Sequence, residues 1–168
     1  EFVWIYHTIV PMILITTIGL LKNKRAFFTA VLACLIAILV LNAFYVFLPS
    51  FYPRNNLSGD GSLSTWLVEF TRQIDGANNT FPSGHVTFSW LMFFSAYECR
   101  LLKKRRYSFI KIIYWLWASG ISVSTLLLKQ HFIIDVFSGI IMAYVCFRTS
   151  KYILLKFSTK LKLQEVNY

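Results

Sequence analysis

The chain has 168 residues, of which 57% are hydrophobic and 18% aromatic, while only 14% carry a charge. Soluble domains carry charge on about a quarter of their residues, so this composition excludes an ordinary soluble domain and predicts a membrane protein. The net charge of +10 does not indicate nucleic-acid binding, because the basic residues stand in short clusters that membrane topology explains.

Two apolar runs open the chain, over residues 2–21 and 26–51. Each reaches the length of about 20 residues that a transmembrane helix needs. No basic segment with a small-residue cleavage site stands at the start, so we expect no signal peptide. Because the chain starts at Glu1 rather than Met, with an N-terminus expected outside, we expect that a sixth, preceding helix is missing from it.

A polar loop rich in proline, asparagine and glycine follows, over residues 52–81. Within it, apolar residues recur at helical spacing from Ser62 to Ile74. This pattern predicts a short amphipathic helix at the membrane interface, capped by Ser62 or Ser64, with an ordinary packed loop as the alternative. The acidic side chains of the loop are interpreted as solvating its surface: Asp60, Glu69 and Asp75.

The third expected span runs over residues 82–102 and ends at a basic cluster. The apolar run 107–156 comes next, and as one helix it would be about 75 Å long, more than twice a hydrocarbon core of about 30 Å. It must fold back, and the polar interruption near its middle is 129–131. The expected spans are therefore 107–128 and 131–153, and the five spans form one domain, an all-α polytopic membrane helix bundle over the whole chain.

Basic residues alternate between the loops, and the positive-inside rule places their clusters on the cytoplasmic side. The loop 52–81 and the turn 129–131 then lie outside. The inside clusters are Lys22, Lys24 and Arg25, then Arg100, Lys103, Lys104, Arg105, Arg106 and Lys111, then Arg148, Lys151, Lys156, Lys160 and Lys162.

Ionisable residues within membrane spans are costly and are usually functional. His131 and Asp135 are four residues apart and share one helix face. The carboxylate can fix the histidine tautomer and leave the other ring nitrogen as a nucleophile or base. The alternative is a polar pair that only satisfies itself.

The second polar group is Pro82-Ser83-Gly84-His85, at the expected start of the third span. Free backbone N–H groups and the positive end of the helix dipole favour a phosphate at such a position. Gly84 permits close approach of the backbone, and the Ser83 hydroxyl adds a donor. The alternative is a helix cap with an incidental histidine.

Together these residues resemble the type 2 phosphatidic acid phosphatase superfamily. Its second motif, Pro-Ser-Gly-His, matches residues 82–85 without change. Its third motif is Ser-Arg, five residues, His, three residues, Asp, and Ser124, His131 and Asp135 match it at the family spacing.

Two departures from the family concern cations. The arginine of the third motif is replaced by Thr125, with Lys129 as a candidate substitute. The first motif, Lys, six residues, Arg-Pro, is reduced to Arg54, because Phe47 and Asn55 stand at its other positions. Pro53-Arg54 is more similar to the divergent branch that includes inositol phosphorylceramide synthases and many bacterial phosphatases.

The resemblance implies hydrolysis of a lipid phosphate or diphosphate without metal or other cofactor. His131 is then the nucleophile held by Asp135, His85 is the general acid and base, and Arg54, Lys129, Ser83 and Gly84 bind the phosphoryl group. A zinc site is the alternative for two histidines and an aspartate, but nearby cations favour a phosphate over a metal.

The predicted substrates are polyprenyl (undecaprenyl) diphosphate, phosphatidic acid or phosphatidylglycerol phosphate. The expected location is the bacterial plasma membrane, with the site facing outside and a lipid entering sideways from the bilayer. Two further functions remain open: a phosphotransferase, in which another alcohol replaces water, and a non-catalytic lipid-binding or transport subunit.

Overall fold

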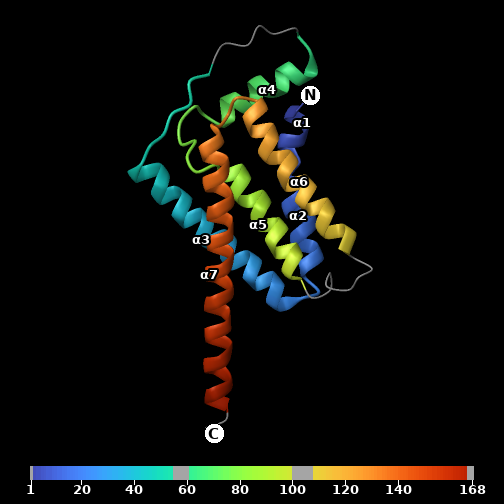
Figure 1. Cartoon of the computed structure of the whole chain (residues 1–168), viewed down its shortest axis with the longest axis vertical. Helices are drawn as coiled ribbons and strands as arrows, with labels where there is room; N and C mark the ends of the chain where they lie inside the picture. The colour runs from blue at the N-terminus through green and yellow to red at the C-terminus, as the bar shows by residue number, and fades with distance from the viewer. Residues whose placement is uncertain (1, 55–60, 100–107, 166–168) are drawn as a thin grey trace.

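A computed structural model of the chain describes residues 2–54, 61–99 and 108–165, with side chains as far as residue 157. These ranges contain helices and one isolated β-bridge, between Phe51 and Asn78. The predicted all-α helix bundle is therefore confirmed (Figure 1). In chain order the helices are α1 (Phe2–His7), α2 (Ile9–Leu20), α3 (Lys24–Phe47), α4 (Leu63–Ile74), α5 (Gly84–Glu98), α6 (Ser108–Leu127) and α7 (Ile133–Glu165).

Among the described residues, four helical stretches are long and apolar enough to cross a membrane. They match the first, second, fourth and fifth expected spans: Phe2–Leu20, Lys24–Phe47, Ser108–Leu127 and Ile133–Phe157. The third expected span differs, because α5 has 15 residues and so is about 22 Å long, less than a hydrocarbon core of about 30 Å. Its predicted end at Leu102 and the basic residues 100–106 lie outside the described residues.

The first expected span consists of two helices, α1 and α2, which meet at Thr8. Pro11 lies in the first turn of α2 and has no N–H to donate to the carbonyl group of His7, against which its ring would also clash. The second expected span ends at Phe47 rather than Phe51, because the residue before Pro49 disfavours the helical conformation.

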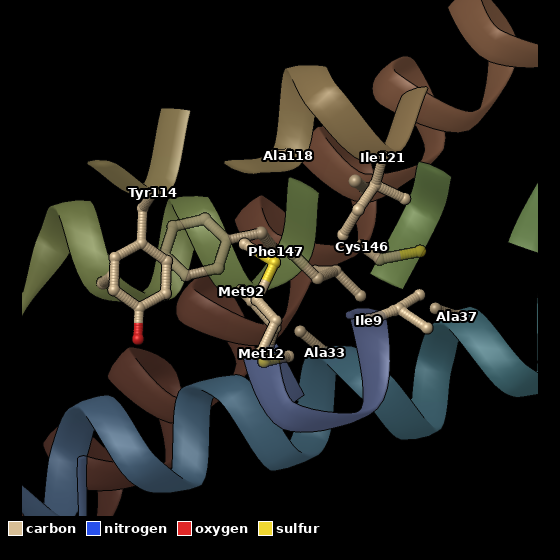
Figure 2. Packing of buried hydrophobic residues seen from close by; sticks show 13 residues of the cluster. Ile9, Met12, Ala33, Ala37, Met92, Tyr114, Ala118, Ile121, Cys146 and Phe147 are labelled. Atoms are coloured by element: carbon tan, nitrogen blue, oxygen red, sulfur yellow. The ribbon is translucent and has the colours of Figure 1, made fainter. Parts of the chain in front are cut away.

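Helix α5 lies at the centre of the bundle and packs against α2, α3, α6 and α7 (Figure 1). Its buried Met92 meets Met12 of α2, Ala33 of α3, Ala118 of α6 and Cys146 of α7 in one hydrophobic cluster (Figure 2). Small residues on several of these helices permit close packing of backbones, as in other membrane bundles. The cluster therefore holds α5 among four neighbouring helices, of which α3, α6 and α7 are longer than α5 itself.

Helix α4 lies at the end of the bundle where α1 and α7 begin (Figure 1). The Ser62 hydroxyl caps it by accepting the N–H of Thr65 at 3.2 Å, so the predicted helix and one of its two predicted caps are confirmed. His7 Nε2 and the Thr71 hydroxyl are 2.8 Å apart and join α1 to α4. One face of α4 exposes large apolar side chains: Leu63, Trp66, Phe70 and Ile74.

The start of α5 and the first turns of α7 are in direct backbone contact. The N–H of Ser83 donates to the carbonyl oxygen of Asp135 at 3.1 Å. One turn further along α7, a Cβ atom on Gly139 would lie 2.9 Å from the Ser83 carbonyl oxygen and 3.1 Å from the Val86 Cβ. Only glycine therefore permits this helix crossing, which sets the relative position of the two segments.

Substitution of Gly139 tests the importance of this close approach. We expect Gly139→Ala to unfold at a temperature several degrees below that of Gly19→Ala in detergent, because overpacking costs about 1–3 kcal/mol. Gly19→Ala is the matched control, since both positions gain helix propensity but an added Cβ at Gly19 meets nothing within 4 Å. Equal unfolding temperatures for the two variants would contradict the close approach.

Candidate active site

Backbone hydrogen bonds close the turn between α6 and α7 without a glycine. The N–H of Lys129 donates to Leu126 O, and the N–H of Gln130 donates to Thr125 O, each at 3.0 Å. This pair of bonds forms a Schellman C-cap. It places Lys129 at a φ of 52°, in the left-handed region that favours glycine. The predicted turn at residues 129–131 is confirmed, and it delivers His131 to the start of α7.

Asp135 both caps α7 and faces His131. Its Oδ2 accepts the N–H of Phe132 at 2.9 Å, so the side chain bonds back to the residue before the helix, as in a capping box. The same oxygen lies 3.4 Å from Nδ1 of His131. Asp135 is 2% exposed. The predicted proximity of these two residues is therefore observed, with Nδ1 of the histidine turned toward the carboxylate.

The residues before α5 are fixed by capping interactions. The Ser83 hydroxyl accepts the N–H of Val86 at 3.4 Å, and Ser83 is fully buried. The Tyr45 hydroxyl donates to the carbonyl oxygen of Pro82 at 3.0 Å. It also lies 3.3 Å from where a Cβ of Gly84 would stand. The first N–H groups of α5 have no acceptor within the helix. His85 is the second residue of that helix.

His85 is held by a network that includes α1 and the end of α4. The Tyr6 hydroxyl donates to Asp75 Oδ2 at 2.5 Å, and its oxygen lies 3.1 Å from Nδ1 of His85. Because the single phenolic proton goes to the carboxylate, Nδ1 of His85 carries the hydrogen that bonds to Tyr6. Nε2 of His85, 3.9 Å from Asp75 Oδ2, is then the nitrogen that exchanges a proton.

The interpretation of Asp75 as a solvating loop residue is wrong. Asp75 ends α4, where it accepts the Tyr6 hydrogen bond and faces His85. Glu69 is exposed as expected, and Asp60 lies outside the described residues. No local sequence pattern pairs Tyr6 with Asp75, because the contact joins segments that are 69 residues apart.

Arg54 lies beside the same site, with its terminal nitrogens bonded to backbone carbonyl groups at the end of α4. Nη1 donates to Asp75 O at 2.5 Å and to Arg72 O at 3.3 Å, and Nη2 donates to Gly76 O at 2.9 Å. Nε of Arg54 is buried without a hydrogen-bond partner among the described residues. Burial lowers the pKa of Arg54 from its ordinary value, and the nearby Arg72 adds to this effect.

These segments enclose a cavity of about 300 Å³. It is lined by Tyr6, Ile9, Tyr45, Arg54, Asp75, Gly76, Asn78, Asn79, Thr80, Gly84, His85, Phe88, Gln130 and His131. Of the predicted site residues, Arg54, Gly84, His85 and His131 line the cavity together, although they come from separate parts of the chain.

The other predicted site residues are placed around the cavity without lining it. Asp135 lies behind His131, and Ser83 is buried in its cap. Lys129 is exposed in the turn. Sequence reasoning also missed Gln130, a 1% exposed residue of the cavity wall whose amide nitrogen and oxygen both lack partners among the described residues.

A second cavity, of about 190 Å³, lies at the opposite end of α5. Its wall includes Asn23, Arg25, Ser95, Glu98 and Lys151, and an ion pair of 2.9 Å joins Lys151 to Glu98. No histidine lines it. Among the described residues, no group of three or more His, Cys, Asp or Glu side chains is placed to hold a metal ion. The paired histidines make the first cavity the candidate active site.

Comparison with known families gives one match, to the PAP2 superfamily over residues 30–158. The matched region contains Arg54, His85, His131 and Asp135, whereas Tyr6 lies before it. No curated protein and no solved structure matches the chain.

The left-handed conformation of Lys129 generates a prediction about stability. Lys129→Gly should raise the free energy of unfolding by about 1 kcal/mol, because glycine removes the cost of a positive φ. Lys129→Ala keeps that cost and serves as the control for loss of the side chain. Thermal unfolding of both variants in detergent is the measurement, and a Lys129→Gly variant no more stable than Lys129→Ala would contradict the strained turn.

Proposed function

The chain belongs to the PAP2 superfamily, which indicates phosphatase-type activity on phosphate esters, and we propose that it hydrolyses a lipid phosphate or diphosphate through a phosphohistidine. The observation that carries this proposal is the arrangement of His131. Its Nδ1, which is buried and makes no hydrogen bond among the described residues, lies 3.4 Å from Asp135 Oδ2, so Nε2 is the ring nitrogen on the side away from the carboxylate. His131 also shares its cavity with His85, so a nucleophile and a proton donor are available to one substrate.

In the first step, Nε2 of His131 attacks phosphorus and the bond from phosphorus to the lipid oxygen breaks. His85 takes part as an imidazolium, protonated on both ring nitrogens, and gives the proton on its Nε2 to that oxygen as it leaves. In the second step, a water molecule attacks the phosphohistidine and gives a proton to Nε2 of His85. The N–P bond breaks, inorganic phosphate leaves, and both histidines return to their starting states.

The geometry of the partners supports these two roles. The Asp135 carboxylate stabilises the positive charge that develops on the His131 ring as it attacks. The Tyr6 oxygen accepts from Nδ1 of His85 and leaves Nε2 of that ring for proton transfer. Both histidines have a carboxylate nearby and both use Nε2, so we assign the roles from the partner of Nδ1, which is the Asp135 carboxylate for His131 and the Tyr6 hydroxyl for His85.

The phosphoryl oxygens need donors that are already in place, since charge on these oxygens redistributes in the transition state. We assign this role to the unpartnered Nε of Arg54 and to the N–H groups at the start of α5, around Gly84. Ser83 positions that turn, and Lys129, exposed beside the site, adds positive charge. The two histidines supply the nucleophile and the acid, and Arg54 and Lys129 supply positive charge, so the proposed chemistry requires no metal.

A lipid substrate fits the surroundings of the cavity. Four stretches of the described chain are long and apolar enough to cross a membrane, and α4, next to the cavity, exposes an apolar face that includes Trp66 and Phe70. A lipid can approach from the bilayer while its phosphate enters the polar cavity. The basic clusters predict that the cavity faces the outside of the cell, and polyprenyl diphosphate, phosphatidic acid and phosphatidylglycerol phosphate are the candidate substrates.

Substitution of each histidine tests the mechanism. Purified protein in EDTA should release phosphate from a lipid phosphate, and His131→Ala should abolish both release and covalent label from a radioactive substrate. His85→Ala should slow turnover by about 10²–10⁴-fold, the usual contribution of general acid–base catalysis. It should still form label with p-nitrophenyl phosphate, whose leaving group needs no proton.

The label should be acid-labile, base-stable and located by peptide mapping at His131. Label at His85, or label retained in His131→Ala, would contradict the assignment of the nucleophile. Absence of phosphate release from every lipid phosphate offered would contradict the proposed function itself.

A further inference from the structure

The side chain of Gln130 is an unpaired amide in the wall of the candidate active site. It is 1% exposed, it lines the cavity of about 300 Å³, and neither Nε2 nor Oε1 has a hydrogen-bond partner among the described residues. Buried polar groups almost always have partners, because leaving one unpaired is costly. An unpaired amide at a cavity wall therefore indicates a polar ligand that completes its hydrogen bonds.

The backbone holds Gln130 in this position. Its N–H donates to the carbonyl oxygen of Thr125 at 3.0 Å, as part of the cap that ends α6. The next residue is His131, which lines the same cavity. A group that reacts at Nε2 of His131 is thus placed next to the residue that carries the free amide.

An amide differs from a lysine or an arginine because it both donates and accepts. A phosphoryl group offers oxygen atoms that accept from Nε2, and a hydroxyl group offers a hydrogen to Oε1. The buried Thr125 cannot take this role, because its hydroxyl donates to Ser122 O at 2.7 Å within α6. Gln130 therefore has the chemistry and the position to contact both reactants of the second step.

We propose that Gln130 is a catalytic residue that binds the phosphoryl group through Nε2 and orients the attacking water through Oε1. This proposal rests on the proposed phosphatase function. In the second step one hydrogen of the water bonds to Oε1 of Gln130, while the other is transferred to Nε2 of His85. The water oxygen then bonds to phosphorus as the bond to His131 breaks.

Replacement by leucine separates a catalytic from a structural role. Gln130→Leu should lower kcat for a lipid phosphate by about 10²–10³-fold, the usual effect of losing one such donor, and should weaken inhibition by inorganic phosphate. It should also raise the unfolding temperature by about 2–4 °C, because it removes an unpaired buried polar group. Gln73→Leu, which removes an exposed amide of α4, should leave kcat and phosphate inhibition unchanged.

Each result decides for or against the proposal. If wild-type protein releases phosphate, then a Gln130→Leu variant with unchanged kcat, or one that unfolds at or below the wild-type temperature, overturns it. Failure of the wild type to release phosphate overturns the phosphatase function instead.

A second variant covers the case in which Gln130→Leu does not fold. Gln130→Glu keeps the size and the acceptor but replaces the donor with a negative charge, so inorganic phosphate should inhibit it weakly at neutral pH and more strongly as acid neutralises the carboxylate. Phosphate inhibition equal to that of the wild type at neutral pH would overturn the proposal.

Discussion

The hydrogen bond from the N–H of Ser83 to the carbonyl oxygen of Asp135 is the interaction on which the site depends. It joins the start of α5 to the first turn of α7, and each of these segments carries one histidine of the cavity. Gly139 permits the contact because its lack of a Cβ leaves room for the Ser83 carbonyl oxygen. Two polar motifs that are far apart in the chain are therefore positioned by backbone atoms rather than by flexible side chains.

The two histidines lie beside carboxylates of different origin. Asp135 belongs to the same helix start as His131, and its second role as a helix cap fixes its carboxylate. Asp75 reaches His85 from the end of α4, and Tyr6 of α1 joins the two. Because Tyr6 precedes the region matched by the PAP2 superfamily, an N-terminal helix outside that region takes part in the network of the proposed general acid.

Much of the fold could be predicted from hydropathy, since the long apolar runs give the four span-length helices and the length of the last run requires a turn. The polar residues that interrupt or start these runs include Arg54, His85 and His131, and these three line one cavity. Local rules also explain two differences from the hydropathy prediction. Pro11 accounts for the break between α1 and α2, and Pro49 accounts for the earlier end of α3.

The remaining features depend on contacts between distant segments. No local sequence pattern predicts the pairing of Tyr6 with Asp75 or the burial of Gln130. An aspartate in a loop and a glutamine in a turn are expected to be solvated, and only the packed bundle shows that these two have other surroundings. The carbonyl partners of Arg54 are equally invisible in sequence, and they show why this arginine also stabilises the end of α4. Side-chain type predicted four residues that line the cavity, whereas the partners that surround them required the packed structure.

A structure of the protein bound to orthovanadate, an analogue of the phosphoryl transition state, tests whether His131 is the nucleophile. We expect vanadium bonded to Nε2 of His131 in the cavity of about 300 Å³, with vanadate oxygens within hydrogen-bond distance of Arg54 Nε and of the Gln130 amide. Vanadium bonded to His85, or vanadate found only in the cavity beside Lys151 at the opposite end of α5, would contradict it.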